Sequence, residues 1–225
     1  MLSGQTASYQ DYEVALLPFD IINISQTSYP GSYSHCCGNA IDFVGYYGGE
    51  RRAYYAPFSC HRTGRTSYGY IYTSNNLVWT PNYGLTYVTV LFSHDNNPPQ
   101  KTSFNQGEII GYMGNYPTTV VTGVHCHTEG ANMANAGYVN SGIKCRPEHD
   151  YTCWMLSNNK PYAGLFYITG DETIRDTKGI SFTKWEGGVT PPTPPTPPAK
   201  KFIKLLLMLK RKRKGGLKRY GAVRV

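Results

Sequence analysis

The chain has 225 residues and a formal net charge of +8, from 22 lysines and arginines against 14 aspartates and glutamates. Eleven of the basic residues and none of the acidic ones lie within residues 200–225, so residues 1–199 carry a net charge of −3. The acidic balance of this larger part argues against nucleic acid as its partner. A chain of this length can form one domain of moderate size whose core needs no disulfide.

The composition predicts a mainly β fold. The chain holds twenty tyrosines, and runs of strong helix formers are scarce. We expect strands at about residues 52–60, 66–73 and 85–93, separated by turn sequences that favour short antiparallel connections. The apolar residues 15–22 are broken by a proline and an aspartate and follow no basic segment. We interpret them as an ordered arm or first strand, and not as a signal peptide or membrane span.

Residues 119–129, Thr-Val-Val-Thr-Gly-Val-His-Cys-His-Thr-Glu, show the β-branched residues and the alternation that are typical of a strand. Side chains two apart on a strand share a face, so His125 and His127 should project together while Cys126 faces the other way. Neutral imidazole is a favoured zinc ligand, and two such rings on a rigid element can share a metal or its water. The alternative is a chance His-x-His on a solvated strand.

Further candidate residues precede this strand. His35 and Asp42 both lie in Tyr-Ser-His-Cys-Cys-Gly-Asn-Ala-Ile-Asp-Phe, and His94 follows an alternating segment. A glycine-marked stretch, Phe-Asn-Gln-Gly-Glu-Ile-Ile-Gly-Tyr-Met-Gly-Asn, separates His94 from the His-x-His pair. From about residue 29 to 129, this order of residues resembles the lysostaphin-type zinc endopeptidases, which cut peptide bonds in bacterial cell walls.

The resemblance implies that His35, Asp42 and His127 are ligands of a Zn²⁺ cofactor. It implies that His94 and His125 are the catalytic pair beside the water that the zinc activates. One neutral histidine would take or relay the proton, and the other would donate a hydrogen bond to the developing oxyanion, with the two roles left open. It also implies an antiparallel β-sheet core of the duplicated-hybrid-motif type.

The spacing of the first two ligands departs from the family pattern. The family places three residues between its first histidine and its aspartate, whereas six residues separate His35 from Asp42. A longer loop can still return both side chains to one metal, since the Gly-Asn pair within it favours a turn. Alternatively, Cys36 and Cys37 would form a closed structural zinc site with a histidine, which leaves the other histidines without a role.

The remaining parts of this region are assigned structural roles. We expect residues 107–115 to form a tight hairpin-like segment, because glycines there permit backbone conformations that other residues resist. The small and polar run after Glu129 is interpreted as a surface loop. His61 lies outside the family pattern and is interpreted as a surface histidine.

The six cysteines are interpreted as reduced core thiols, because no signal peptide supports export through an oxidising compartment. His149 lies between Cys145 and Cys153. A polar loop with two buried thiols is favoured there over a second metal site.

A Pro/Thr-rich linker at residues 189–199 is expected to separate a catalytic domain at residues 1–188 from a basic tail at residues 200–225. The apolar run of the tail is far shorter than the roughly 20 residues of a membrane span. We expect an interfacial helix that binds an anionic surface, either membrane lipid or teichoic acid. A disordered cationic tail is the alternative.

The sequence thus predicts a zinc-dependent peptidoglycan endopeptidase. Residues 171–185 look like the end segment of bacteriophage lysins of this family. Such a lysin would be made in the host bacterial cytoplasm without a signal peptide and would act at the cell wall or from the virion. Two alternatives are an inactive zinc-containing wall-binding module and a membrane-active antimicrobial protein that acts through its cationic tail.

Overall fold

The computed structural model describes residues 1–27, 35, 40–47, 50–119, 121–139, 142–144 and 162–187. The chain divides into two units, Met1–Pro194 and Pro195–Val225, and all of the described residues belong to the first. Every regular element in these ranges is a strand, so the predicted mainly β fold is confirmed. No helix in the described ranges is long and apolar enough to cross a membrane.

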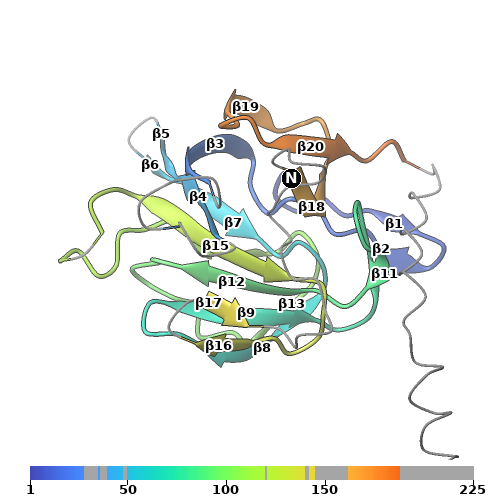
Figure 1. Ribbon diagram of the computed structural model, residues 1–225, viewed down its shortest axis with the longest axis horizontal. Coiled ribbons are helices and arrows are strands. Elements are labelled where there is room, and N and C mark those ends of the chain that lie inside the picture. The colour runs from blue at the N-terminus through green and yellow to red at the C-terminus, as the bar shows by residue number, and fades with distance from the viewer. Residues whose placement is uncertain are drawn as a thin grey trace, which may run out of the picture. The chain divides into compact units, whose positions relative to one another are not determined.

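Eight strands form the central sheet, and Figure 1 shows most of them side by side. Their spatial order is β13 (Ser103–Phe104), β8 (Cys60–Arg65), β9 (Gly69–Ser74), β12 (Thr89–Ser93), β15 (His125–Ala131), β4 (Ala40–Val44), β3 (Ile21–Gln26) and β19 (Thr173–Asp176). All neighbouring pairs are antiparallel except β3 and β19, which pair in parallel. The sheet is therefore mixed at one edge, where the resemblance implied an antiparallel core.

The other described strands form two-stranded pairs around this sheet. They are β1 (Ser8–Tyr9) with β2 (Tyr12–Glu13), β5 (Tyr46–Tyr47) with β6 (Glu50–Arg51), β7 (Ala53–Tyr55) with β14 (Ile109–Tyr112), β10 (Val78–Thr80) with β11 (Gly84–Thr86), β16 (Gly137–Val139) with β17 (Gly142–Lys144), and β18 (Tyr162–Ile168) with β20 (Ser181–Lys184).

The central sheet has two chemically different faces, because alternate side chains of a strand point to opposite sides. On one face, Phe43, Phe92 and Cys126 are buried in the main hydrophobic core. On the other face, β15 carries His125 and His127. Further along, this second face holds a small apolar cluster of Ile71, Leu91, Ala131, Ala136 and Ile143. The predicted separation of the two histidines from Cys126 is therefore confirmed.

Several predicted elements differ from the structure in their boundaries or partners. The strand expected at residues 85–93 is two strands, since β11 ends at Thr86 and β12 begins at Thr89, and the strand expected at residues 66–73 is β9, Gly69–Ser74. The strand expected at residues 52–60 is two strands, since β7 ends at Tyr55 and β8 begins at Cys60. Pro57 lies between them and has no N–H for a sheet ladder. Residues 107–115 do not form a hairpin of their own, because β14 pairs with β7.

The strand expected at residues 119–129 starts later and ends later. It begins at His125 and continues to Ala131, so the start of the predicted loop after Glu129 is strand. The amide of Val121 donates to the carbonyl oxygen of Pro117 at 3.0 Å, and this turn precedes the strand despite the β-branched residues there. Local turn geometry outweighs strand propensity at this point.

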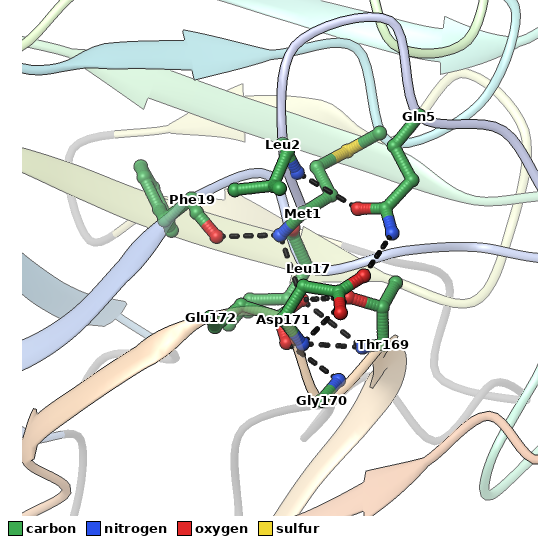
Figure 2. Close-up of polar contacts among 9 residues, drawn as sticks. All are labelled: Met1, Leu2, Gln5, Leu17, Phe19, Thr169, Gly170, Asp171 and Glu172. Atoms are coloured by element: carbon green, nitrogen blue, oxygen red, sulfur yellow. Dashed lines mark hydrogen bonds and ion pairs between the residues drawn. The ribbon is translucent and has the colours of Figure 1, made fainter.

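The N-terminal segment is ordered and leads into the central sheet, as predicted. Residues 14–19 are buried, and β3 follows them beside β4. The Met1 ammonium donates to the carbonyl oxygens of Leu17 at 3.0 Å and Phe19 at 2.6 Å, and it pairs with the Glu172 carboxylate at 2.7 Å (Figure 2). This contact joins the first residues to the segment that carries β19.

Candidate metal centre

The register of two central strands brings two of the three candidate metal ligands, Asp42 and His127, together. In the antiparallel pair of β15 and β4, His127 lies directly opposite Asp42. The two side chains face each other, with His127 Nδ1 3.1 Å from Asp42 Oδ1. Residues 85 positions apart in the chain therefore meet because of the strand pairing alone.

His35 completes this cluster from outside the sheet. Its Nε2 atom lies 3.4 Å from Asp42 Oδ2, and its ring centroid lies 5.0 Å from that of His127. His35 and Asp42 are only 4% and 3% exposed, so they are held together away from bulk water. The six-residue separation in the sequence thus still returns both side chains to one point.

The donor set of His35, Asp42 and His127 fits a zinc ion. One ligand atom from each lies within 4.8 Å of the other two. Donors about 2 Å from a tetrahedral ion lie roughly 3.3 Å from one another. The two oxygens of Asp42 lie at comparable separations from the histidines, Oδ1 at 3.1 Å from His127 Nδ1 and Oδ2 at 3.4 Å from His35 Nε2. Two imidazoles and one carboxylate are also a common set of three protein ligands, which leaves a fourth position open.

The other two candidate histidines lie beside this cluster. The His94 ring centroid is 4.7 Å from that of His125 and 5.8 Å from that of His127. His125 Nε2 lies 3.7 Å from Asp42 Oδ2. All five residues that the resemblance implied are therefore in one place.

His94 is held in an unusual backbone conformation at the end of β12. Its φ of +78° lies in the left-handed region, which is uncommon for residues with a Cβ. The amide of Tyr116 donates to the His94 carbonyl oxygen at 3.1 Å. Any side chain at Gly114 would collide with that same oxygen. Such strain persists only where the surroundings enforce it, and it is concentrated at functional sites.

The carboxylate of Asp42 and the ring of His127 stabilise each other's charges. Burial tends to raise the pKa of Asp42, but the hydrogen bond from His127 and the attraction of the protonated forms of His127, His35 and His125 outweigh it, and the pKa is lowered. Burial tends to lower the pKa of His127, but hydrogen bonds to Asp42 and Glu129 raise it to about 9. Without a metal, His127 is therefore protonated at neutral pH.

The pKa values of His94 and His35 shift in the opposite direction and are lowered. Burial is the largest cause for both: it lowers the pKa of His94 to about 4, and it lowers the pKa of His35 against the opposing charge of Asp42. Both rings are consequently neutral at pH 7. Neutral imidazole is the form that binds a metal or accepts a proton.

Glu129 is a polar residue of the site that the sequence analysis missed. Its Oε1 atom lies 3.0 Å from His127 Nε2, and its Oε2 atom accepts a hydrogen bond from the backbone amide of Ile143. A Cβ at Gly142, where φ is +109°, would lie 2.7 Å from Oε2, so this close approach requires glycine. The signal in the sequence was the strand alternation, which places Glu129 on the same face as His127.

The other predicted residues lie away from the cluster or outside the described residues. His61 is exposed and contacts the Asn75 side chain at 2.8 Å, which confirms its interpretation as a surface histidine. Cys60 and Cys126 are free buried thiols, as predicted. The remaining candidates lie outside the described residues: Cys36, Cys37, Cys145, His149, Cys153, the linker and the basic tail.

No protein-family model and no curated protein matches the chain. Among solved structures, it is similar to Helicobacter pylori Csd3 in two crystal forms. The hexagonal form matches with 16% sequence identity and a TM-score of 0.33, and the orthorhombic form with 17% identity and a TM-score of 0.32. Each match covers 65% of this chain and 42% of the Csd3 chain, so this protein spans less than half the length of that neighbour.

Proposed function

We propose that this protein is a zinc-dependent endopeptidase that hydrolyses stem or cross-bridge peptides of bacterial peptidoglycan. One observation carries the proposal. Five side chains that the resemblance to lysostaphin-type enzymes selects from distant parts of the sequence converge on a single site. The substrate class comes from that resemblance, and the reaction type from the donor set.

His35, Asp42 and His127 are the residues that would hold the zinc ion. When bound there, zinc supplies a Lewis acid for the scissile carbonyl and lowers the pKa of a water molecule towards about 7. The buried Asp42 carboxylate contributes the negative charge that favours a divalent cation. Glu129 accepts a hydrogen bond from the outer nitrogen of His127, which keeps Nδ1 directed at the metal position.

His94 and His125 are suited to proton transfer. His94 Nδ1 lies 2.7 Å from the Tyr116 carbonyl oxygen, and His125 Nδ1 lies 2.9 Å from that of Gly123. A carbonyl oxygen only accepts hydrogen bonds, so Nδ1 carries the proton in each neutral ring and Nε2 keeps its lone pair. Each Nε2 can therefore accept a proton and afterwards donate it to an oxyanion or a leaving amine.

The biological setting is part of the same proposal. The protein would be a bacteriophage lysin that is made in the host cytoplasm and acts at the cell wall. Its basic tail would bind anionic lipid or teichoic acid. The composition of residues 200–225 and the resemblance of residues 171–185 to lysin end segments support this setting.

Release of new amino groups from purified Gram-positive peptidoglycan tests the function. We expect release by the wild type, loss after chelation, and recovery with added zinc. His127→Ala should abolish release through loss of the metal, and His94→Ala should lower it at least about 100-fold with zinc still bound. His61→Ala is the matched control, because His61 is exposed and is not one of the five residues of the candidate site.

Other results would favour the alternatives. Folded, zinc-loaded protein that binds walls of several chemotypes and releases no amino groups would be a binding module. Lysis that survives His127→Ala and disappears on removal of residues 200–225 would instead identify a membrane-active protein.

A further inference from the structure

A cavity of about 370 Å³ lies next to His94. Its walls include Arg65, Tyr68, Tyr70, Asp95, Asn96 and Tyr116. The ring centroid of Tyr68 lies 6.3 Å from that of His94, and the carbonyl oxygen of Tyr116 contacts His94 Nδ1 at 2.7 Å. Two residues of the cavity wall, Tyr68 and Tyr116, therefore adjoin His94 of the candidate catalytic pair. The cavity volume is within the range of small-ligand pockets.

The one acidic group in the cavity wall is already engaged by the protein. Asp95 is 8% exposed. Its Oδ1 atom accepts a hydrogen bond from the Asn97 amide at 2.8 Å, and its Oδ2 atom accepts bonds from the Tyr112 amide at 2.9 Å and the Tyr54 hydroxyl at 3.3 Å. Asp95 thus anchors the surrounding loops and offers little to a cationic ligand.

Arg65 is the available charge in the cavity wall. It is exposed, and within the described ranges no carboxylate lies at ion-pair distance from its guanidinium group. The nearby Arg62 is engaged differently, since its guanidinium carbon lies 4.5 Å from the ring centroid of Tyr70 and its Nη1 donates to the Pro99 carbonyl oxygen at 3.3 Å.

We propose that this cavity is a substrate subsite for a peptide residue with a free carboxylate, and that Arg65 determines this specificity. The guanidinium group is planar and always charged, and its donors match the two oxygens of a carboxylate. Tyr68 and Tyr116 are 45% and 49% exposed, so their rings can pack against the aliphatic part of the same residue. The inference rests on the proposed endopeptidase function.

The geometry also limits where this carboxylate lies in the substrate. The ring centroids of His127 and His94 are 5.8 Å apart, and those of His94 and Tyr68 are 6.3 Å apart. An extended peptide advances about 3.5 Å per residue. The Tyr68 ring in the cavity wall is therefore at most roughly 12 Å from the His127 ring, a span that an extended peptide covers in no more than about four residues.

Binding to the zinc-free protein tests the subsite without hydrolysis. The probes are soluble peptidoglycan fragments, either untreated or with their carboxylates converted to amides by carbodiimide and ammonia. We expect calorimetry to show that the wild type binds the untreated fragments at least about tenfold more tightly, since charge-assisted pairs are the strong ones. Arg65→Ala should lose this preference, and Arg65→Lys should retain part of it. Lys178→Ala is the control, because Lys178 follows β19 at the opposite edge of the sheet.

Kinetics of the zinc-loaded protein separate this inference from the proposed function. Arg65→Ala should raise KM for untreated fragments about tenfold, leave kcat within about twofold, and leave cleavage of amidated fragments unchanged. If the wild type cleaves neither probe but still binds through Arg65, the endopeptidase function fails and the carboxylate site stands. If folded Arg65→Ala binds or cleaves untreated fragments as the wild type does, the subsite is overturned.

Discussion

At the residue scale, Glu129 connects the candidate ligand His127 to the backbone of β17. A carboxylate behind a metal-binding histidine fixes the ring orientation and increases its basicity. Glu129→Gln keeps an acceptor oxygen but removes the charge. We expect this change to weaken zinc binding about 10- to 100-fold, measured by competition with a chromophoric chelator.

Glu108→Gln is the matched control for this variant, because Glu108 is a surface residue that pairs with Lys101. Thermal unfolding of the metal-free variants tests whether Glu129→Gln destabilises the fold by weakening the hydrogen bond from the Ile143 amide. An unchanged unfolding temperature assigns any loss of zinc affinity to the missing charge. An unchanged zinc affinity in folded Glu129→Gln would show that the carboxylate plays no part in metal binding.

The raised pKa of His127 predicts that zinc binding releases a proton. At pH 7.5 the metal-free ring is protonated, because its pKa is about 9, and it must become neutral to bind a metal. Calorimetric titrations in buffers with different ionisation enthalpies should give at least about one proton per zinc at this pH, to which metal-bound water adds, and the share from His127 should fall above pH 9. Release of no proton at pH 7.5 would mean that His127 is neutral before zinc binds.

The same pKa has a consequence for the stability of the metal-free protein. A folded-state pKa above the ordinary value of 6.5 means that the folded state binds the proton more tightly. This contribution to the free energy of unfolding is complete below pH 6.5 and is lost as the pH rises through about 9. Denaturation curves should therefore show that the difference in the free energy of unfolding between wild type and His127→Ala narrows as the pH rises across this range.

At the element scale, the buried ion pair of Met1 and Glu172 holds two distant segments together (Figure 2). Both groups have no solvent exposure, and Glu172 also accepts hydrogen bonds from the amides of Thr169 and Gly170. Removing one partner leaves the other buried and unpaired. Glu172→Gln should therefore lower the free energy of unfolding by about 3 kcal/mol in urea denaturation.

Asp176→Asn provides the comparison for this ion pair. Asp176 pairs with Lys178 on the surface, where solvent screens the ion pair and makes its contribution to stability small. Equal free energies of unfolding for Glu172→Gln and Asp176→Asn would show that burial of the Met1 ammonium does not require the charge of Glu172.

The sequence predicted some features of the elements and missed others for identifiable reasons. Strand alternation was enough to place His125 and His127 on one face and Cys126 in the core. Alternation says nothing about which strand lies alongside, so the pairing of His127 with Asp42 required either the resemblance or the structure. The pairing of β14 with β7 was missed because glycine-marked turns favour local hairpins, whereas this contact is between distant segments.

The cavity beside His94 illustrates a second limit of prediction from the sequence. Arg65 and Tyr116 are 51 positions apart, and neither belongs to a motif. They line one cavity because β8, which ends at Arg65, pairs with β9, β9 pairs with β12, and the loop after β14 returns to His94. Periodicity and spacing describe single elements, so they cannot identify a binding site that forms between several loops.

At the scale of the whole molecule, charge is distributed unevenly along the chain. Residues 200–225 carry eleven basic residues and residues 1–199 have a net charge of −3. Each basic residue near an anionic surface contributes about 1 kcal/mol before salt screening. Deletion of residues 200–225 should therefore abolish co-sedimentation with anionic vesicles at low salt and leave hydrolysis of soluble fragments unchanged.

Neutral vesicles are the reference in this experiment, since a cationic tail gains no electrostatic energy from them. Equal binding of the full and shortened chains to anionic vesicles would assign surface attachment to residues 1–199 instead.

The parallel pairing of β3 with β19 has a consequence for synthesis of the protein. Thr173 lies beside Ile21, so one edge of β3 has no partner until the ribosome has delivered almost the entire first unit. An unpaired strand edge rich in isoleucine is a site of intermolecular association. A chain that stops before β19 would keep all five site residues but would leave this edge of β3 open to pairing with another chain.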